Sequence, residues 1–291
     1  MKIILLLIIL ILPFRAASQS ATEQSPVLRF CPSGLGFAPL KAGNQEPRMG
    51  LCKFMNSSGM DVEIGNAAEI LALDLPAANL TLALGIDFFG RAFVTGSEGL
   101  RLQVDALDGF FGGDISCSRE LETGSLMGRL RILHQSSHFV DGHISPGGSG
   151  WIDGLSPIPY TRDFGELTLG HLLRYPGGNV RYYAGFSYAT LVRPSDIERF
   201  AYFTGVEAAL GNLIGPVLGK PAHLYFAYHL ALDGAPSLAG SNRVQLGVKI
   251  GEWSGGGTDF YVAYYNGRHI FGEYVYQRLD TFGAGFMVDF F

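Results

Sequence analysis

A histidine and a serine two positions apart, His134 and Ser136, are the residues of this sequence best placed to do chemistry together. From Leu126 onward the segment alternates as a β-strand does, so the apolar Leu130 and Ile132 share a face with this pair. Residues two apart on a strand lie about 6.6 to 6.8 Å apart, which lets an imidazole approach a hydroxyl. A serine beside a general base is the minimum arrangement of an activated nucleophile. Both residues are therefore candidate catalytic residues.

The next predicted strand carries a carboxylate that could orient the imidazole. Asp163 has the parity of that strand's apolar face, and a hairpin symmetric about Gly148–Ser149 would bring it nearly opposite His134. The carboxylate would then accept a hydrogen bond from one ring nitrogen and leave the other free to take the serine proton. A register shift leaves two alternatives for this orienting role, Thr161 and Asp141.

Two other interpretations of the same region stay open. His, Ser and Asp side chains at the rim of a membrane protein also suit an interfacial role, solvated by lipid head groups. On the opposite face of the strand, Arg129 and Arg131 point to the interior together with Arg162 of the next strand, and they would bind anions in an open lumen. A small anion-preferring pore and a structural barrel without turnover are thus the alternative functions.

The elements that position these residues are short alternating strands. The chain is 47% hydrophobic and 16% charged, yet after residue 20 no run of 18 uncharged apolar residues could form a helical span. Leu80–Phe88, Arg243–Gly251 and Phe282–Phe290 each place apolar residues on one face and small or polar residues on the other. This pattern predicts an all-β protein, a transmembrane antiparallel β-barrel of about 12 strands with a range of 10 to 14. A soluble β-sandwich is the alternative.

One connection does not fit the barrel topology. We expect strands near residues 99–108 and 124–138, which leaves Gly109–Thr123 as a long turn on the side where turns should be short. A missed element in this stretch is the natural explanation.

The N-terminus predicts export. Lys2 precedes an apolar run, Ile3–Pro13, which is followed by Arg15 and the small residues Ala16–Ser18. This is the form of a cleaved secretory signal. We therefore expect a signal peptide at 1–18, an extended lead-in at 19–49 and the barrel at 50–291, located in a bacterial outer membrane. The net charge of −5 gives no support for nucleic-acid binding. If the three cysteines form one bridge, we expect it between Cys31 and Cys52.

Three motifs resemble an uncharacterised family of bacterial outer-membrane proteins that carry a domain of unknown function. They are Phe37–Ala42 in the lead-in, His134–His138 at a strand end, and Tyr264–Arg268 near the C-terminus. The resemblance spans the mature chain and implies a barrel and a location, but no activity. The chain departs from that pattern at Phe139–Asp141, where the family has Gly-Asp-Glu, and this puts any role of that acidic turn in doubt.

The His-x-Ser pair on an outward-facing strand resembles the active sites of outer-membrane phospholipase A and of the lipid A deacylases. The resemblance implies that Ser136 attacks a lipid acyl ester, His134 transfers protons and Asp163 orients His134. Those enzymes usually carry asparagine where this chain has Ser137. The partners implied are outer-membrane lipids, lipopolysaccharide and the barrel-assembly machinery. No cofactor is expected, although calcium assistance stays open, with a weak loop metal site formed by His138, Asp141 and His143.

Overall fold

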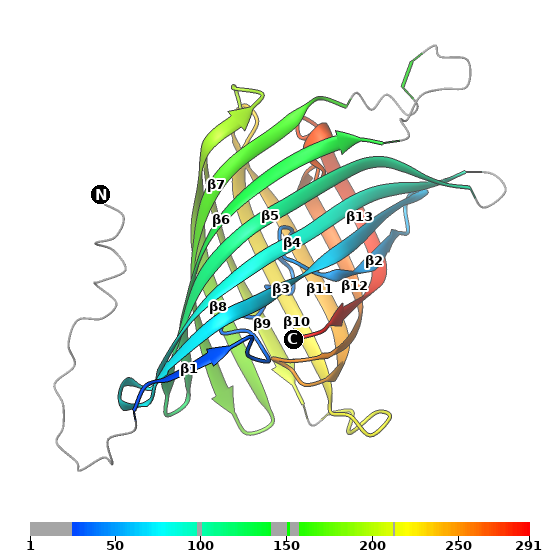
Figure 1. Ribbon diagram of the computed structural model, residues 1–291. Helices are drawn as coiled ribbons and strands as arrows, with labels where there is room; N and C mark the ends of the chain where they lie inside the picture. Colours follow the sequence, from blue (N-terminus) through cyan, green and yellow to red (C-terminus); the bar gives the residue numbers. More distant parts are fainter. Residues whose placement is uncertain (1–24, 98–100, 141–149, 152–156, 212) are drawn as a thin grey trace.

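The computed structural model is a closed antiparallel β-barrel (Figure 1). It describes residues 25–97, 101–140, 150–151, 157–211 and 213–291. No helix among these residues is long and apolar enough to cross a membrane. The strands are β1 Val27–Phe30, β2 Met49–Phe54, β3 Gly59–Leu75, β4 Leu80–Ser97, β5 Arg101–Leu121, β6 Gly124–Phe139, β7 Tyr160–Tyr175, β8 Gly178–Arg193, β9 Phe200–Leu210, β10 Ala222–Gly234, β11 Leu238–Gly251, β12 Gly257–Arg268 and β13 Arg278–Asp289.

Two short strands share the first position of the barrel. β1 pairs with β3 at Leu71–Asp74, and β2 pairs with the same strand at Met60–Glu63. On its other side β2 pairs with β13, which closes the sheet. The sheet therefore has 12 positions around the barrel, which confirms the predicted fold class and strand number.

The chain between β1 and β2 leaves the wall and enters the lumen. We call residues 31–48 the plug. Phe37, Leu40 and Ala42 are buried inside the barrel. Lys41 places its Nζ 3.0 Å from Asp259 and 2.9 Å from Asp289, both on the inner face of the wall. A lumen lined by charged side chains is thus filled by a segment that supplies the opposite charges.

The barrel has two distinguishable ends. The strand part of the chain begins with β1 and finishes with β13 at one end, which we call the termini end (Figure 1). β6 ends and β7 begins at the other end, which we call the loop end (Figure 1). There the turn Gly272–Tyr274 is buried, and the Gly272 N–H donates to Asp108 on the inner face of β5.

The expected long turn at Gly109–Thr123 is wrong, because β5 is one 21-residue strand that runs through it. Gly109, Gly112 and Gly113 resemble turn residues in the sequence, yet all three pair with both β4 and β6. Strand glycines are tolerated here because the neighbouring strands satisfy their backbone groups.

The expected Cys31–Cys52 bridge is also wrong, since all three cysteines are free thiols. The Cys31 N–H donates to the carbonyl of Ile70, whereas Cys52 pairs with Asp61. At about 3.3 Å per strand residue, these two points on β3 lie roughly 30 Å apart. No disulfide can cover that distance.

Candidate active site on the outer wall

Alternation along β6 sorts its side chains into two sets. Leu126 and Ile132 point outward, with 44% and 69% of their surface exposed, and His134, Ser136 and His138 have the same parity. The other parity points inward and is buried, as expected for a strand between two environments. The structure thus places the candidate nucleophile and its base on the outer face of the barrel.

Asp163 lies directly opposite His134 in the pairing of β6 with β7. The Nδ1 atom of His134 is 2.6 Å from Oδ1 of Asp163. A carboxylate accepts a proton at Nδ1 and so favours the tautomer whose Nε2 is unprotonated and able to act as a base. The Phe111 ring packs on the imidazole, with centroids 4.8 Å apart. The ring is therefore held by a hydrogen bond on one edge and an aromatic contact on a face.

Ser136 does not hydrogen-bond to His134 in this structure. Its Oγ lies 3.0 Å from Nε2 of His138, the next outward residue of β6. Two imidazoles therefore flank the serine along one strand, and only His134 is given a carboxylate partner on β7. Sequence reasoning assigned His138 to a loop metal site. The two-residue spacing from Ser136 already identified it as a neighbour on the same face.

Thr161 and Asp141 are the alternatives to Asp163 as the residue that orients His134. The Thr161 hydroxyl donates to the backbone carbonyl of Gln135 at 2.9 Å, so its proton is already used. Asp141 lies outside the described residues, as does His143 of the expected metal site. Among the residues that the structure describes, no cluster of three or more His, Cys, Asp or Glu side chains could hold a metal ion.

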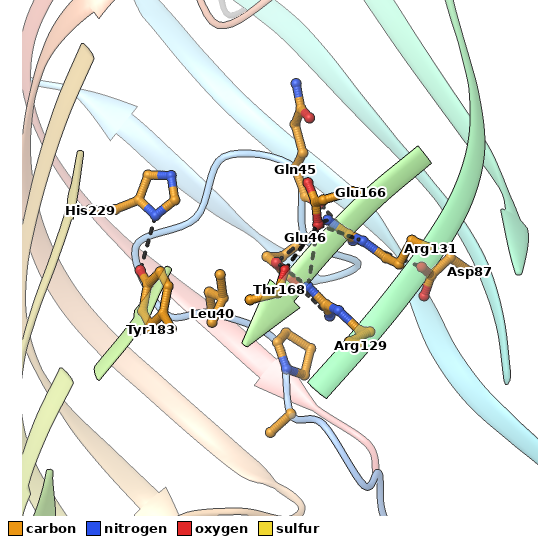
Figure 2. Close-up of polar contacts among 12 residues, drawn as sticks. Leu40, Gln45, Glu46, Asp87, Arg129, Arg131, Glu166, Thr168, Tyr183 and His229 are labelled. Carbon is orange, nitrogen blue, oxygen red and sulfur yellow. Dashed lines mark hydrogen bonds and ion pairs between the residues drawn. The ribbon is translucent and has the colours of Figure 1, made fainter. Parts of the chain in front are cut away.

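The three inward arginines lie inside the barrel, where each has a polar partner. Figure 2 shows Glu46 of the plug facing Arg129, with Nη2 to Oε1 at 2.7 Å. Arg131 lies 2.6 Å from Oε1 of Glu166 on β7. The third, Arg162, donates to the Gln135 side chain at 2.8 Å. The guanidiniums of Arg129 and Arg131 are compensated by carboxylates, one of which belongs to the plug, rather than free for a passing anion.

Glu46 is the plug carboxylate whose charge faces Arg129 of the wall. Burial by itself would raise the pKa of this carboxyl, but the charges of Arg129 and Arg131 and the hydrogen bonds from Arg129 lower the pKa to about 2. Two cavities adjoin the plug. One of about 310 Å³ is lined by Pro39 and Lys41, and one of about 80 Å³ is lined by Asn44 and Glu46.

No family model matches the chain, and no curated protein matches it closely enough to count as a relative.

Proposed function

We propose that this chain is an outer-membrane hydrolase that cleaves acyl esters of membrane lipids, with Ser136 as nucleophile, His134 as general base and acid, and Asp163 as the residue that orients His134. The observation that carries the proposal is the 2.6 Å contact between His134 and Asp163 on the outer face of the wall. Half-exposed polar groups on an apolar wall are costly in lipid unless they serve a purpose. An oriented imidazole next to a serine is such a purpose.

The outer-membrane location is part of the same proposal. A closed barrel leaves no strand edge unpaired in lipid, and its outer wall carries large exposed apolar side chains such as Phe88, Ile132 and Leu246. The predicted signal peptide at 1–18 provides the route across the inner membrane. Most connections at the termini end are short, such as 122–123 and 176–177, with 211–221 as the exception, and the longest connection between strands, 140–159, is at the loop end. This difference suits a periplasmic and an external side, respectively.

The proposed reaction begins with a change of the Ser136 rotamer. Rotation of the Ser136 side chain moves Oγ from His138 toward Nε2 of His134. As Oγ attacks the ester carbonyl carbon, its proton passes to Nε2, and the resulting imidazolium is stabilised by Asp163. Collapse of the tetrahedral intermediate releases the alcohol, which takes the proton from His134, and leaves an acyl-serine. Water, deprotonated by the same nitrogen, then attacks the acyl-serine; the fatty acid is released, and His134 returns the proton to Oγ of Ser136.

Lipid analysis tests the proposal. Phospholipids and lipid A from cells that produce the protein are compared by mass spectrometry with those from cells that produce Ser136→Ala, with folding of both barrels verified by heat-modifiable gel mobility. A lost acyl chain that depends on Ser136 is the expected result. Identical lipids in both strains, with both barrels folded, would contradict it.

A further inference from the structure

One line of paired residues crosses the outer wall through Ser136. Direct cross-strand partners point to the same face of a sheet, so all members of the line face outward with Ser136. The register from β3 to β8 gives Ile64, Gly90, Gly109, Ser136, Thr161 and Arg193. The line differs on the two sides of Ser136. Toward β8 it ends in the guanidinium of Arg193, and toward β3 it passes over Gly109 and Gly90, which have no side chain.

Arg193 is the charged member of this line. It is exposed at the loop end of β8, two strands from Ser136, which is about 10 Å at the usual strand spacing. An extended arginine side chain covers most of that distance. Within the described part of the chain, its Nη1 donates to the neighbouring carbonyl of Val192 at 3.1 Å.

A second guanidinium lies close by. Arg199 donates from Nη1 to the carbonyls of Ala189 and Thr190 at 3.0 and 2.6 Å, and the Thr190 hydroxyl donates to the carbonyl of Asp163. Asp196 and Glu198 lie between these two arginines in the sequence, and Asp163 lies on β7 opposite His134. Asp163 is engaged by His134, and Asp196 accepts from the Tyr276 hydroxyl at 2.6 Å.

The opposite side of Ser136 is bare. A Cβ added to Gly109 would meet nothing closer than the Ser136 backbone oxygen at 3.8 Å and Oγ at 3.9 Å, and one added to Gly90 nothing closer than 3.5 Å. The exposed rings of Phe88 and Phe111 border this bare strip. The strands are tilted in the wall (Figure 1). The line runs from Arg193, the last residue of β8 at the loop end, to Ile64, which lies five residues inside β3.

We propose that Arg193, assisted by Arg199, binds the phosphate of a lipid substrate whose acyl chain lies over Gly109 and Gly90, so that the ester is presented to Ser136. This inference rests on the proposed hydrolase function and narrows its substrates to anionic, phosphate-bearing lipids. A phosphate on the Arg193 side and hydrocarbon on the glycine side match the orientation of a lipid in the outer leaflet. Arginine is suited to this contact because its fork of donors fits a phosphate.

Two measurements on purified protein in an uncharged maltoside detergent test the inference. The first is hydrolysis of phosphatidylglycerol and of diacylglycerol with the same acyl chains. The second is binding of dodecyl phosphate, with inorganic phosphate titrated separately, to the Ser136→Ala protein. Each is repeated with Arg193→Gln and with a matched control, Arg278→Gln, an exposed arginine at the loop end of β13.

We expect Arg193→Gln to raise KM for phosphatidylglycerol and weaken dodecyl phosphate binding roughly tenfold, about one charge-assisted contact. The effect of Arg193→Gln on diacylglycerol, which has no phosphate, should be much smaller than its effect on phosphatidylglycerol. Arg278→Gln should match the unsubstituted protein in both measurements, and inorganic phosphate should bind far more weakly than dodecyl phosphate. Hydrolysis that needs Ser136 but ignores Arg193 would overturn the phosphate site and leave the hydrolase. Arg193-dependent binding without any Ser136-dependent hydrolysis would leave the phosphate site and overturn the hydrolase. If inorganic phosphate bound as tightly as dodecyl phosphate, recognition of a lipid would be overturned.

Discussion

In the proposed hydrolysis, the hydrogen bond between His134 and Asp163 sets the imidazole tautomer on which turnover would depend. In Asp163→Asn the side-chain amide can donate to Nδ1, which places the ring proton on Nε2 and removes the base. We expect Ser136-dependent hydrolysis to fall roughly 10²- to 10⁴-fold, the usual range for loss of acid–base catalysis. Steady-state kinetics on a soluble short-chain ester measure it. Asp280→Asn, an outward carboxylate bonded to Asn266, is the control and should be neutral.

The two imidazoles beside Ser136 can be separated by substitution. His134→Gln should abolish turnover, because among the described residues this is the ring of the two that contacts a carboxylate. His138→Gln should retain activity within about threefold, since loss of its 3.0 Å contact merely frees the serine to rotate. Kinetics on the same short-chain ester distinguish the roles of the two rings. Full activity in His134→Gln and none in His138→Gln would assign the base to His138.

At the scale of the strand, Gly109 tests the bare strip on β5. Its Cβ position is open, so Gly109→Leu should fold, but the new side chain would lie beside Ser136 where we place the acyl chain. We expect at least a tenfold loss on long-chain lipids and a much smaller effect on a short-chain ester, since only the longer chain reaches over β5 and β4. Gly96→Leu, another open outward position on β4, is the control. Equal losses on both substrates would point to a damaged site instead.

The sequence predicts a contact where local alternation and a turn determine it, but not where side-chain torsions or distant segments determine it. The pairing of His134 with Asp163 follows from the midpoint of one hairpin, because alternation and a turn centre determine register. The rotamer that directs Ser136 to His138 does not follow, since it involves only side-chain torsions. The strand character of Gly109–Gly113 was missed because glycine marks turns in isolation, whereas two neighbouring strands decide its conformation here. Contacts such as Glu46 with Arg129, 83 residues apart, have no local signature.

At the scale of the whole molecule, the plug makes stability depend on pH. The pKa of Glu46 is lowered from 4.5 to about 2 on folding, so its contribution is fully present above about pH 4.5 and is lost as the pH falls toward 2. We expect the melting temperature in detergent to fall over this window, and to fall less in Glu46→Gln. Circular dichroism during heating at pH 6, 4 and 3 measures it. Glu120→Gln, which removes an exposed pair with Arg174, should keep the wild-type profile.

Because the plug fills the lumen, we expect the wild-type barrel to conduct ions poorly. Replacing Lys41 with methionine leaves Asp259 and Asp289 without their plug partner inside the wall, and breaking a buried ion pair typically costs about 3–5 kcal/mol. We expect the Lys41→Met protein to show channel openings in planar bilayers that the wild type lacks. A wild-type protein with steady, large conductance would contradict a lumen sealed by the plug.

The shared first position of β1 and β2 has a consequence for assembly. The plug is tied to the wall at both of its ends, by Phe30 on one side and Met49 on the other. Insertion and closure are thereby coupled, because β2 both ends the plug and forms the closing pair with β13. We expect the plug to lie against the inner surface before β2 meets β13, so that closing this seam encloses it.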